Sequence, residues 1–423
     1  MSIQPKLPRL YYLDAMRSVL MMLGVVLHAA AIYAVSADWV ISDPVKNNTL
    51  NWIWRLIAQF RMPCFFIISG FFCYVTLQRY GTKKFLNIRL PRIIIPLITT
   101  ALLFNSLQNF IVFHLYSEIP FQLSLSQYLM DGYWVSHLWF LNCLVIYFLI
   151  AATGYYLIAK HTLYLYEKIT NKLPWVRGGA YLLIVPLGTI SLNMLSYRID
   201  SIIDTSGFFL NIHEIFYFGG FFFFGYLMAF NRNLFNEFSL FYLWVPVAVI
   251  MAFIGGIYLE EQNDIFSKIL NRYSLAFLPW GFAVMCFAFF RKFFDKPSKG
   301  FNYLADASYS IYLFHHFFVV IFGLIFLVVD WHTYVKFSLV VVLSMSLSLL
   351  LHHYVVSRFT LMSWLFNGKS LKYKNLKVIL PTSYAFQIDQ NETNKSFRSE
   401  NDRKNYADKT PVTKTLKAEE TKI

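Results

Sequence analysis

Three ionisable residues lie within one long apolar stretch near the start of the chain, from Tyr11 to Tyr33. The stretch is long enough to cross a bilayer as a helix, yet it contains Asp14, Arg17 and His28, and a charge inside a membrane costs several kcal/mol. Arg17 and His28 are 11 residues apart, so in a helix they share one face, about 16 Å apart along the axis. A histidine can accept a proton and an arginine can bind an anion. The pattern predicts a functional polar stripe inside the membrane.

Arg61 and His315 are further ionisable residues within apolar segments. Counting about 1.5 Å per residue from the segment ends puts both near the depth of His28. We therefore expect His28, Arg61 and His315 to approach one another. His316 adjoins His315, but neighbouring residues on a helix point about 100° apart, so we expect only one of them to face the site and His316 to fill space.

Five more residues are candidates for substrate binding, and each has a plainer alternative. Arg89 and Arg92 begin the third apolar segment, where they could bind an anion or only mark the cytoplasmic side. Trp139 and Tyr309 are of types that often serve packing or the membrane interface. Ser69 precedes a glycine, so it could belong to a close helix–helix contact instead.

The sequence contains no pattern typical of a metal site or of a bound nucleotide. The vicinal pairs His315-His316 and His352-His353 are poor chelates, and the cysteines lie in apolar runs without CxxC spacing. There is no phosphate-binding loop and no GxSxG turn. We expect no metal and no permanently bound cofactor.

The composition indicates an all-α, polytopic membrane protein. Of 423 residues, 57% are hydrophobic and only 14% are charged, against about 25% charged in soluble domains. Ten apolar segments are near the length needed to span a bilayer, and their approximate ranges are 12–35, 52–77, 90–113, 138–159, 178–196, 208–230, 239–259, 273–290, 304–329 and 335–357.

The basic residues alternate between loops. They are concentrated in the N-terminus and in the loops after the second, fourth and eighth segments, whereas the first, third, fifth and seventh loops contain few. By the positive-inside rule this places both termini in the cytoplasm. The net charge of +14 therefore reflects topology and not nucleic-acid binding. We expect a cytoplasmic N-terminus at 1–11, a ten-helix domain at 12–368 and a disordered cytoplasmic tail at 369–423.

Several stretches together resemble the acyltransferase-3 family of membrane acyltransferases. They include an Arg–ten residues–His arrangement, an FF-x-x-SG helix, an R-x-x-R start, an HLWFL segment and an SYS-x-YL-x-H segment. The similarity is greatest to the branch that succinylates osmoregulated periplasmic glucans, which typically has the arginine found at position 61. In order, the stretches are YYLDAMRSVLMMLGVVLH (11–28), FRMPCFFIISGFF (60–72), IRLPRIIIPL (88–97), SHLWFLNCLVIYF (136–148), ASYSIYLFHH (307–316) and WLFNGK (364–369).

The resemblance implies a multi-pass enzyme of the inner membrane with cytoplasmic acyl-CoA, here succinyl-CoA, as co-substrate. The acceptor would be a hydroxyl of a periplasmic glucan. O-Acetylation of lipopolysaccharide or another envelope polysaccharide is the main alternative within acyl transfer. A transporter of an acyl donor or glycan precursor is a different class, but the sequence has no inverted repeat to favour it.

The resemblance also implies roles for the candidate residues. His28 would be the general base or an acyl-carrying relay. Arg17 would orient the thioester arm, and Arg89 with Arg92 would bind the phosphates of CoA. Arg61 or His315 would stabilise the oxyanion or hold the carboxylate of succinate.

Overall fold

The computed structural model describes residues 10–116, 128, 132–172, 174–203 and 211–369, and these contain helices but no β-strand. Most of the predicted N-terminus and tail lie outside the described residues. The chain divides into two units, Met1–Leu10 with Leu380–Ile423 and Tyr11–Ile379, and only the second concerns the site. Its helices are α1 (Tyr11–Tyr33), α2 (Asn48–Arg89), α3 (Pro91–Thr100), η1 (Ala101–Asn105), α4 (Ser106–Leu115), η2 (Ser136–Leu138), α6 (Trp139–Lys172), η3 (Pro174–Leu183), α7 (Val185–Ile203), α8 (Ile212–Phe230), α9 (Arg232–Phe238), α10 (Trp244–Glu260), α11 (Ile265–Phe294), α12 (Lys299–Leu327), α13 (Thr333–Leu351), η4 (His352–Val356) and α14 (Thr360–Asn367).

Eight helical stretches among the described residues are long and apolar enough to cross a membrane, which supports a multi-pass membrane protein. One of them, Asn48–Leu115, has 68 residues and contains two of the predicted segments. Another predicted segment corresponds to α10, which is shorter, with 17 residues. The count of ten and the side of each terminus stay predictions. The eight stretches are Tyr11–Tyr33, Asn48–Leu115, Ser136–Tyr155, Gly178–Ile202, Ile212–Phe230, Ile265–Phe294, Lys299–Leu327 and Thr333–Val356.

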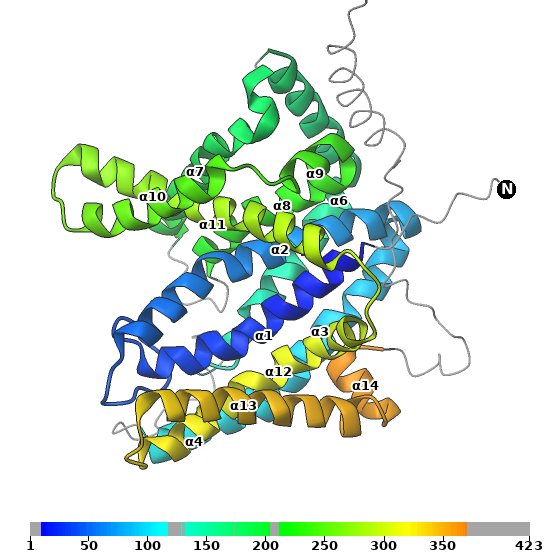
Figure 1. The fold of residues 1–423 in the computed structure, drawn as a ribbon. Coiled ribbons are helices and arrows are strands. Elements are labelled where there is room, and N and C mark those ends of the chain that lie inside the picture. Colours follow the sequence, from blue (N-terminus) through cyan, green and yellow to red (C-terminus); the bar gives the residue numbers. More distant parts are fainter. Residues whose placement is uncertain (1–9, 117–127, 129–131, 173, 204–210, 370–423) are drawn as a thin grey trace, which may run out of the picture. The chain divides into compact units, whose positions relative to one another are not determined.

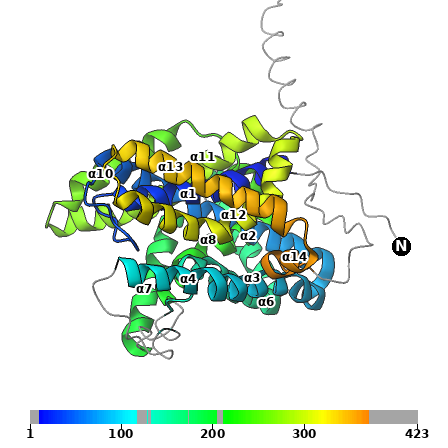
Figure 2. The ribbon, with the colours of Figure 1, turned by 90° about the horizontal axis from the view of Figure 1, so that it is seen from below.

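Helix α1 lies between α2 and the pair α12 and α13 (Figure 1). It runs parallel to α12, because Arg17 contacts Ala305 near the start of both helices and Ile32 approaches Gly323 near their ends. Figure 2 shows α12 and α13 running alongside α1. This parallel pairing sets residues in the second half of α1 opposite the middle of α12.

Helix α2 is long, with 42 residues, and both its start and a break inside it have clear local causes. The side chain of Asn47 caps it by accepting a hydrogen bond from the backbone N–H of Leu50. Gly81 interrupts the helix with a φ of 72°, a conformation that favours glycine. The 48–80 part is therefore separated from a short basic part that leads to Arg89.

Two glycines let α2 and α8 approach until their backbones touch. A Cβ atom at Gly70 would overlap the carbonyl oxygen of Phe222 and lie 2.9 Å from the backbone nitrogen of Tyr226. A Cβ atom at Gly225 would overlap the carbonyl of Ile67. Small residues at such contacts are typical of helices packed in membranes. The close helix–helix contact that was the alternative for this stretch is therefore present at Gly70.

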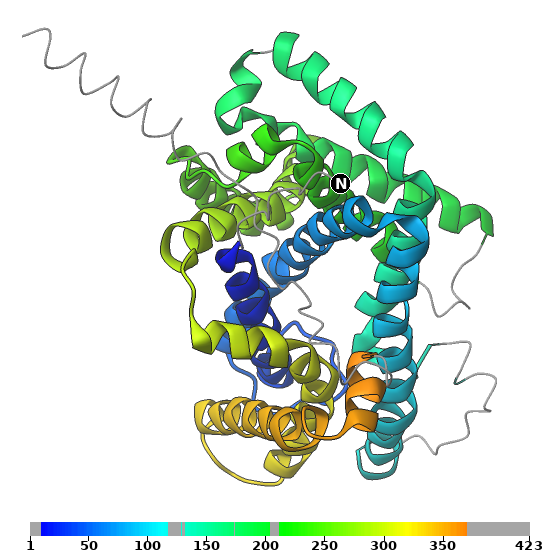
Figure 3. The ribbon, with the colours of Figure 1, turned by 90° about the vertical axis from the view of Figure 1, so that its right-hand side faces the viewer.

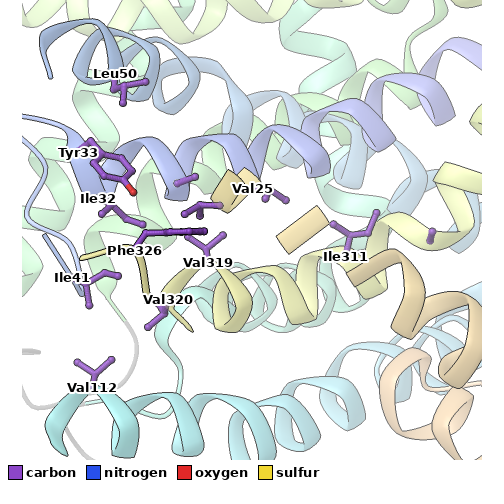
Figure 4. Packing of buried hydrophobic residues seen from close by; sticks show 13 residues of the cluster. Val25, Ile32, Tyr33, Ile41, Leu50, Val112, Ile311, Val319, Val320 and Phe326 are labelled. Carbon is purple, nitrogen blue, oxygen red and sulfur yellow. The ribbon is translucent and has the colours of Figure 1, made fainter. Parts of the chain in front are cut away.

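An apolar core fills the space between the second half of α1 and α12. Val25 and Ile32 of α1 lie opposite Val319 and Val320 of α12, with Ile41 of the following loop beside them (Figure 4). Side chains of α2, α4 and α13 complete this core. Polar groups placed next to this core are held away from bulk water. Electrostatic interactions are stronger in such surroundings than in water.

Candidate active site

Four histidines from three elements meet beside the apolar core, and we call them the histidine cluster: His28 on α1, His137 on η2, and His315 and His316 on α12. The ring centroid of His28 lies 5.4 Å from that of His315 and 5.0 Å from that of His316. The ring of His137 stacks on His316 at 4.6 Å with an angle of 7° between the planes. The predicted approach of His28 and His315 is therefore observed.

The expectation that only one of the two adjacent histidines would reach His28 is wrong. Their side chains do point in different directions, and the rings of His315 and His316 are 6.4 Å apart and nearly perpendicular. His28 lies close to both because α1 approaches α12 between these two directions. His316 is thus part of the cluster and does not merely fill space.

The hydrogen bonds of α12 fix which nitrogen of His315 is available. Its Nδ1 lies 3.0 Å from the carbonyl oxygen of Ile311 and 2.8 Å from that of Tyr312, and carbonyls only accept, so Nδ1 donates. Its Nε2 is enclosed and has no hydrogen-bond partner among the described residues. A Cβ atom at Gly24 of α1 would lie 3.5 Å from this nitrogen. The free nitrogen therefore faces α1.

Arg61 of α2 places a buried guanidinium at the same point. Its side chain is 8% exposed, and a Cβ atom at Gly24 would overlap its Nη1. Its Nε has no hydrogen-bond partner, and no ion pair of Arg61 occurs within the part of the chain that the structure describes. A buried cation without a carboxylate partner is costly. Arg61 is thus a buried cation beside His315 that forms no ion pair with the described residues.

Two residues outside the predicted set complete the surroundings of the cluster. Nδ1 of His316 donates to Oε1 of Gln108 at 2.8 Å. The ring of Trp39 stacks on His28 at 5.7 Å and meets His316 edge-on at 5.4 Å. The cluster is therefore enclosed by α4 on one side and by the loop after α1 on another.

Arg17 lies at the other end of α1. Its Nη2 donates to the carbonyl oxygen of Ala305 at 3.3 Å, near the start of α12. The side chain is partly exposed, although its Nε is enclosed and finds no hydrogen-bond partner in the described part of the chain. Arg17 is thus attached to the same helix pair as His28 but is separated from it along the axis, as the spacing predicts.

Arg89 and Arg92 lie beyond the break in α2, and both are held by neighbours. Nη2 of Arg89 donates to Oγ1 of Thr76 at 2.7 Å. The hydroxyl of Tyr309 donates to the carbonyl oxygen of Arg92 at 3.0 Å. The residue after α14, Gly368, packs against the same backbone, since its Cβ atom would lie 2.8 Å from the nitrogen of Arg92. Figure 3 shows α14 beside α3, in which Arg92 is the second residue.

Tyr309 connects this basic end to the histidine cluster. Its ring lies 6.5 Å from that of Tyr312, nearly parallel to it. The hydroxyl of Tyr312 donates to the carbonyl oxygen of His137 at 2.8 Å. One face of α12 therefore contacts both the turn that contains Arg89 and Arg92, which we call the arginine turn, and the histidine cluster.

Trp139 and Ser69 lie elsewhere. Among the described residues, the ring of Trp139 contacts Phe66 and Phe218, at 6.2 and 5.1 Å. Ser69 is partly buried beside the close contact at Gly70. The structure thus brings together His28, Arg61 and His315, and it does not place these two residues among them.

Sequence reasoning missed His137, Gln108 and Trp39. His137 lies in the HLWFL stretch quoted above, so its histidine could have been counted with the others. Gln108 is a polar residue inside the third apolar segment, which was also a signal. Trp39 lies in a loop, and nothing in its sequence context indicates that it returns to His28.

The histidine cluster does not resemble a metal centre. Among the described residues, no group of three His, Cys, Asp or Glu side chains is arranged to hold a metal ion. His137 and His316 present their ring faces to each other, whereas a metal is bound by ring nitrogens. The cluster is better suited to proton transfer.

Comparison with known proteins gives one family. A family model described as an acyltransferase domain, of the acyltransferase-3 type, matches residues 10–353. Glucans biosynthesis protein C of Escherichia coli O17:K52:H18 (strain UMN026 / ExPEC) is 25% identical over 379 residues, covering 85% of this chain and 95% of that protein. The protein of the same name from Escherichia coli (strain K12) gives the same values. No solved structure matches the chain with significance.

Proposed function

The chain belongs to the acyltransferase-3 family, and from this premise we propose that it moves a succinyl group from cytoplasmic succinyl-CoA to hydroxyls of a periplasmic glucan. The proposal places the enzyme in the inner membrane, with the donor and the acceptor on opposite sides. Support for the acceptor comes from the relatives, whose name refers to glucans biosynthesis.

The observation that carries the proposal is the meeting of His28, Arg61 and His315 from three separate helices beside an apolar core. An imidazole that can take a proton lies beside a buried cation that has no carboxylate partner among the residues that the structure describes. Acyl transfer needs both groups, because a hydroxyl must lose a proton while a negative charge develops on the carbonyl oxygen.

His28 acts as the general base in this account. It takes the proton of the acceptor hydroxyl as the hydroxyl oxygen bonds to the thioester carbon. The resulting oxyanion is stabilised by the guanidinium of Arg61. The carbon–sulfur bond then breaks, the thiolate takes the proton back from the imidazolium, and the products are the ester and free CoA.

His315 keeps its place through the bonds of its Nδ1 to the α12 backbone, which leave Nε2 facing Gly24 of α1, where the guanidinium of Arg61 also lies. We assign the free carboxylate of succinate or the oxyanion to Arg61. His315 shares this ligand only when its ring is doubly protonated, because Nε2 of the neutral ring accepts hydrogen bonds and does not donate them. A relay in which His28 itself carries the acyl group is the other route, and trapping of an acylated enzyme in a single turnover distinguishes the two.

The donor enters from the basic end of the helices. Arg89 and Arg92 bind the CoA phosphates, Tyr309 holds the Arg92 backbone, and Arg17 orients the thioester arm. Phosphate binding by arginine through charge-assisted hydrogen bonds supports this assignment. Arg17, near the start of α1, then acts on the thioester arm of the donor, and His28, in the second half of α1, acts where the acyl group is transferred.

Mass spectrometry of periplasmic glucans from cells with and without the protein tests the proposal. We expect succinyl groups on the glucans only when the protein is present. Added acetyl groups would assign the alternative donor, and acetylation of lipopolysaccharide with unchanged glucans would assign the alternative acceptor. No change in any envelope polysaccharide would contradict acyl transfer by this chain.

A further inference from the structure

The loop between α1 and α2 folds back over the histidine cluster, and we call residues 34–47 the cap loop. Its Trp39 is the residue that reaches the cluster. The indole lies 5.7 Å from the His28 ring with 27° between the planes, and 5.4 Å from the His316 ring. One side chain of the cap loop therefore touches two imidazoles.

The cap loop is tied to the end of α1 by its backbone. The N–H of Asp43 donates to the carbonyl oxygen of Ile32 at 2.9 Å, and the N–H of Asn47 donates to that of Tyr33 at 2.9 Å. Ile41 is fully buried in the apolar core. The two hydrogen bonds join backbone before Trp39 to backbone after it, and Ile41 is only two residues away in sequence. These contacts therefore restrict where the indole can lie.

A buried ion pair attaches the cap loop to α13. Nζ of Lys336 lies 2.9 Å from Oδ2 of Asp43, and these residues are only 5% and 1% exposed. The other carboxylate oxygen of Asp43 accepts from the N–H of Val45 at 2.8 Å. Removing one partner of such a pair leaves an uncompensated buried charge, which is strongly destabilising. The pair therefore holds the loop in one position.

We propose that Trp39 is a positioning residue for His28, which fixes the imidazole by stacking and keeps water away from it. This inference rests on the proposed function, in which His28 accepts the proton of a hydroxyl. Water is the natural competitor of that hydroxyl. When water takes its place, His28 accepts the water proton, the water oxygen bonds to the thioester carbon, and the carbon–sulfur bond breaks to give free acid and CoA.

The indole suits this role because its face covers the imidazole without offering a second base. Aromatic stacking orients a ring with little loss of side-chain freedom. Exclusion of water from an active site suppresses hydrolysis of reactive acyl donors. Trp39 is itself partly exposed, so it lies between the cluster and the surface of the described structure.

The test uses the purified full-length protein, succinyl-CoA and a glucan acceptor, and it measures both CoA release and succinyl ester formed. We expect Trp39→Ala to raise the fraction of donor lost to hydrolysis about fivefold or more and to lower kcat for transfer. The donor KM should stay unchanged. We call the division of the donor between hydrolysis and transfer the partition. Trp39→Phe, which keeps a stacking ring, should retain the partition of the wild-type protein.

Trp331→Ala is the matched control. Trp331 is 51% exposed and packs on Phe326, and no ring contact joins it to the histidine cluster within the described residues, so the variant should divide the donor between hydrolysis and transfer as the wild type does. If the Trp39→Ala protein does not accumulate, Trp39→Leu takes its place. A second variant, Lys336→Met, breaks the ion pair that holds the cap loop and should therefore also raise hydrolysis of the donor. The double variant Asp43→Asn/Lys336→Met removes both charges and should restore much of the wild-type partition.

Unchanged partition and kcat in Trp39→Ala, or in Trp39→Leu, would overturn the inference. So would a Trp39→Phe variant as hydrolytic as Trp39→Ala, because stacking would then not be what matters. Failure of the proposed function is seen separately, as full transfer activity in His28→Ala.

Discussion

The rings of His28 and His315 lie 5.4 Å apart because α1 and α12 pack in parallel. The same pairing brings Arg17 to Ala305 at one end and Ile32 to Gly323 at the other. A shift of one helix along the other would break all three contacts at once. The site therefore depends on the register of this helix pair.

Arg61 should distinguish between acyl donors. Its buried guanidinium has no carboxylate partner among the described residues, so a succinyl carboxylate is a suitable anion for it. We expect Arg61→Ala to lower transfer about 100- to 1,000-fold with succinyl-CoA. The loss with acetyl-CoA should be smaller, and rates measured with both donors on the same preparation check this.

Equal losses with the two donors would remove Arg61 as a ligand of the carboxylate and leave only an oxyanion role. Arg61→Lys serves as the control for charge alone. It keeps the positive charge but lacks the planar fork, so partial recovery would show how far geometry matters.

Gly24 should be required for the position of Arg61. Any side chain at Gly24 would overlap Nη1 of Arg61, whereas its Cβ would only make ordinary contact with Nε2 of His315. We expect Gly24→Ala to lower kcat about 10- to 100-fold, because small displacements of catalytic groups have effects of this size. Gly188→Ala on α7 is the control, since none of the described residues lies within 4 Å of the Cβ it would add. Wild-type activity in Gly24→Ala would show that Arg61 can move without consequence.

The α2–α8 contact should be sensitive to single methyl groups. Gly70→Ala and Gly225→Ala would each place Cβ against backbone of the opposite helix, which cannot give way as a side chain can. We expect each to destabilise the protein by about 1–3 kcal/mol, seen as a lower thermal midpoint in detergent. Gly255→Ala on α10 would add a Cβ that no described residue approaches within 4 Å, so it should change the midpoint little. An unchanged midpoint for both α2–α8 variants would contradict the close approach.

Tyr309 should act on the donor and not on the chemical step. Its hydroxyl holds the carbonyl of Arg92, so Tyr309→Phe removes one hydrogen bond from the arginine turn. A loss of about 0.5–1.5 kcal/mol is typical of such a bond, which corresponds to a rise in the KM for acyl-CoA of about 2- to 13-fold. Tyr303→Phe, at a residue that is 42% exposed, is the control. A fall in kcat with constant KM would instead place Tyr309 at the reacting atoms.

Much of the site could be predicted from sequence because membrane helices constrain depth. An apolar span has two known ends, so counting residues along it predicts which of His28, Arg61 and His315 lie level. The family resemblance is confirmed by the match over residues 10–353. It was harder to predict which of the adjacent residues His315 and His316 faces the site. The angle of about 100° between them does not reveal that α1 approaches α12 between their two directions.

The parts that were missed depend on tertiary structure. Trp39 reaches His28 only because the cap loop folds back on α1, and the Lys336–Asp43 pair that holds the loop joins residues far apart in the chain. Loops have no periodicity from which direction can be read. The backbone contact of Gly368 with Arg92 is likewise a feature of packing between distant segments.

The most direct test of the account is the acylation of periplasmic glucans, measured by mass spectrometry, in cells that produce His28→Ala at the wild-type level. His114→Ala, at an exposed histidine stacked on Phe110, is the control and should acylate normally. Loss of a general base predicts a decrease of about 100- to 10,000-fold for His28→Ala, so that glucans remain without acyl groups. Normally acylated glucans in that strain would contradict the central role of His28.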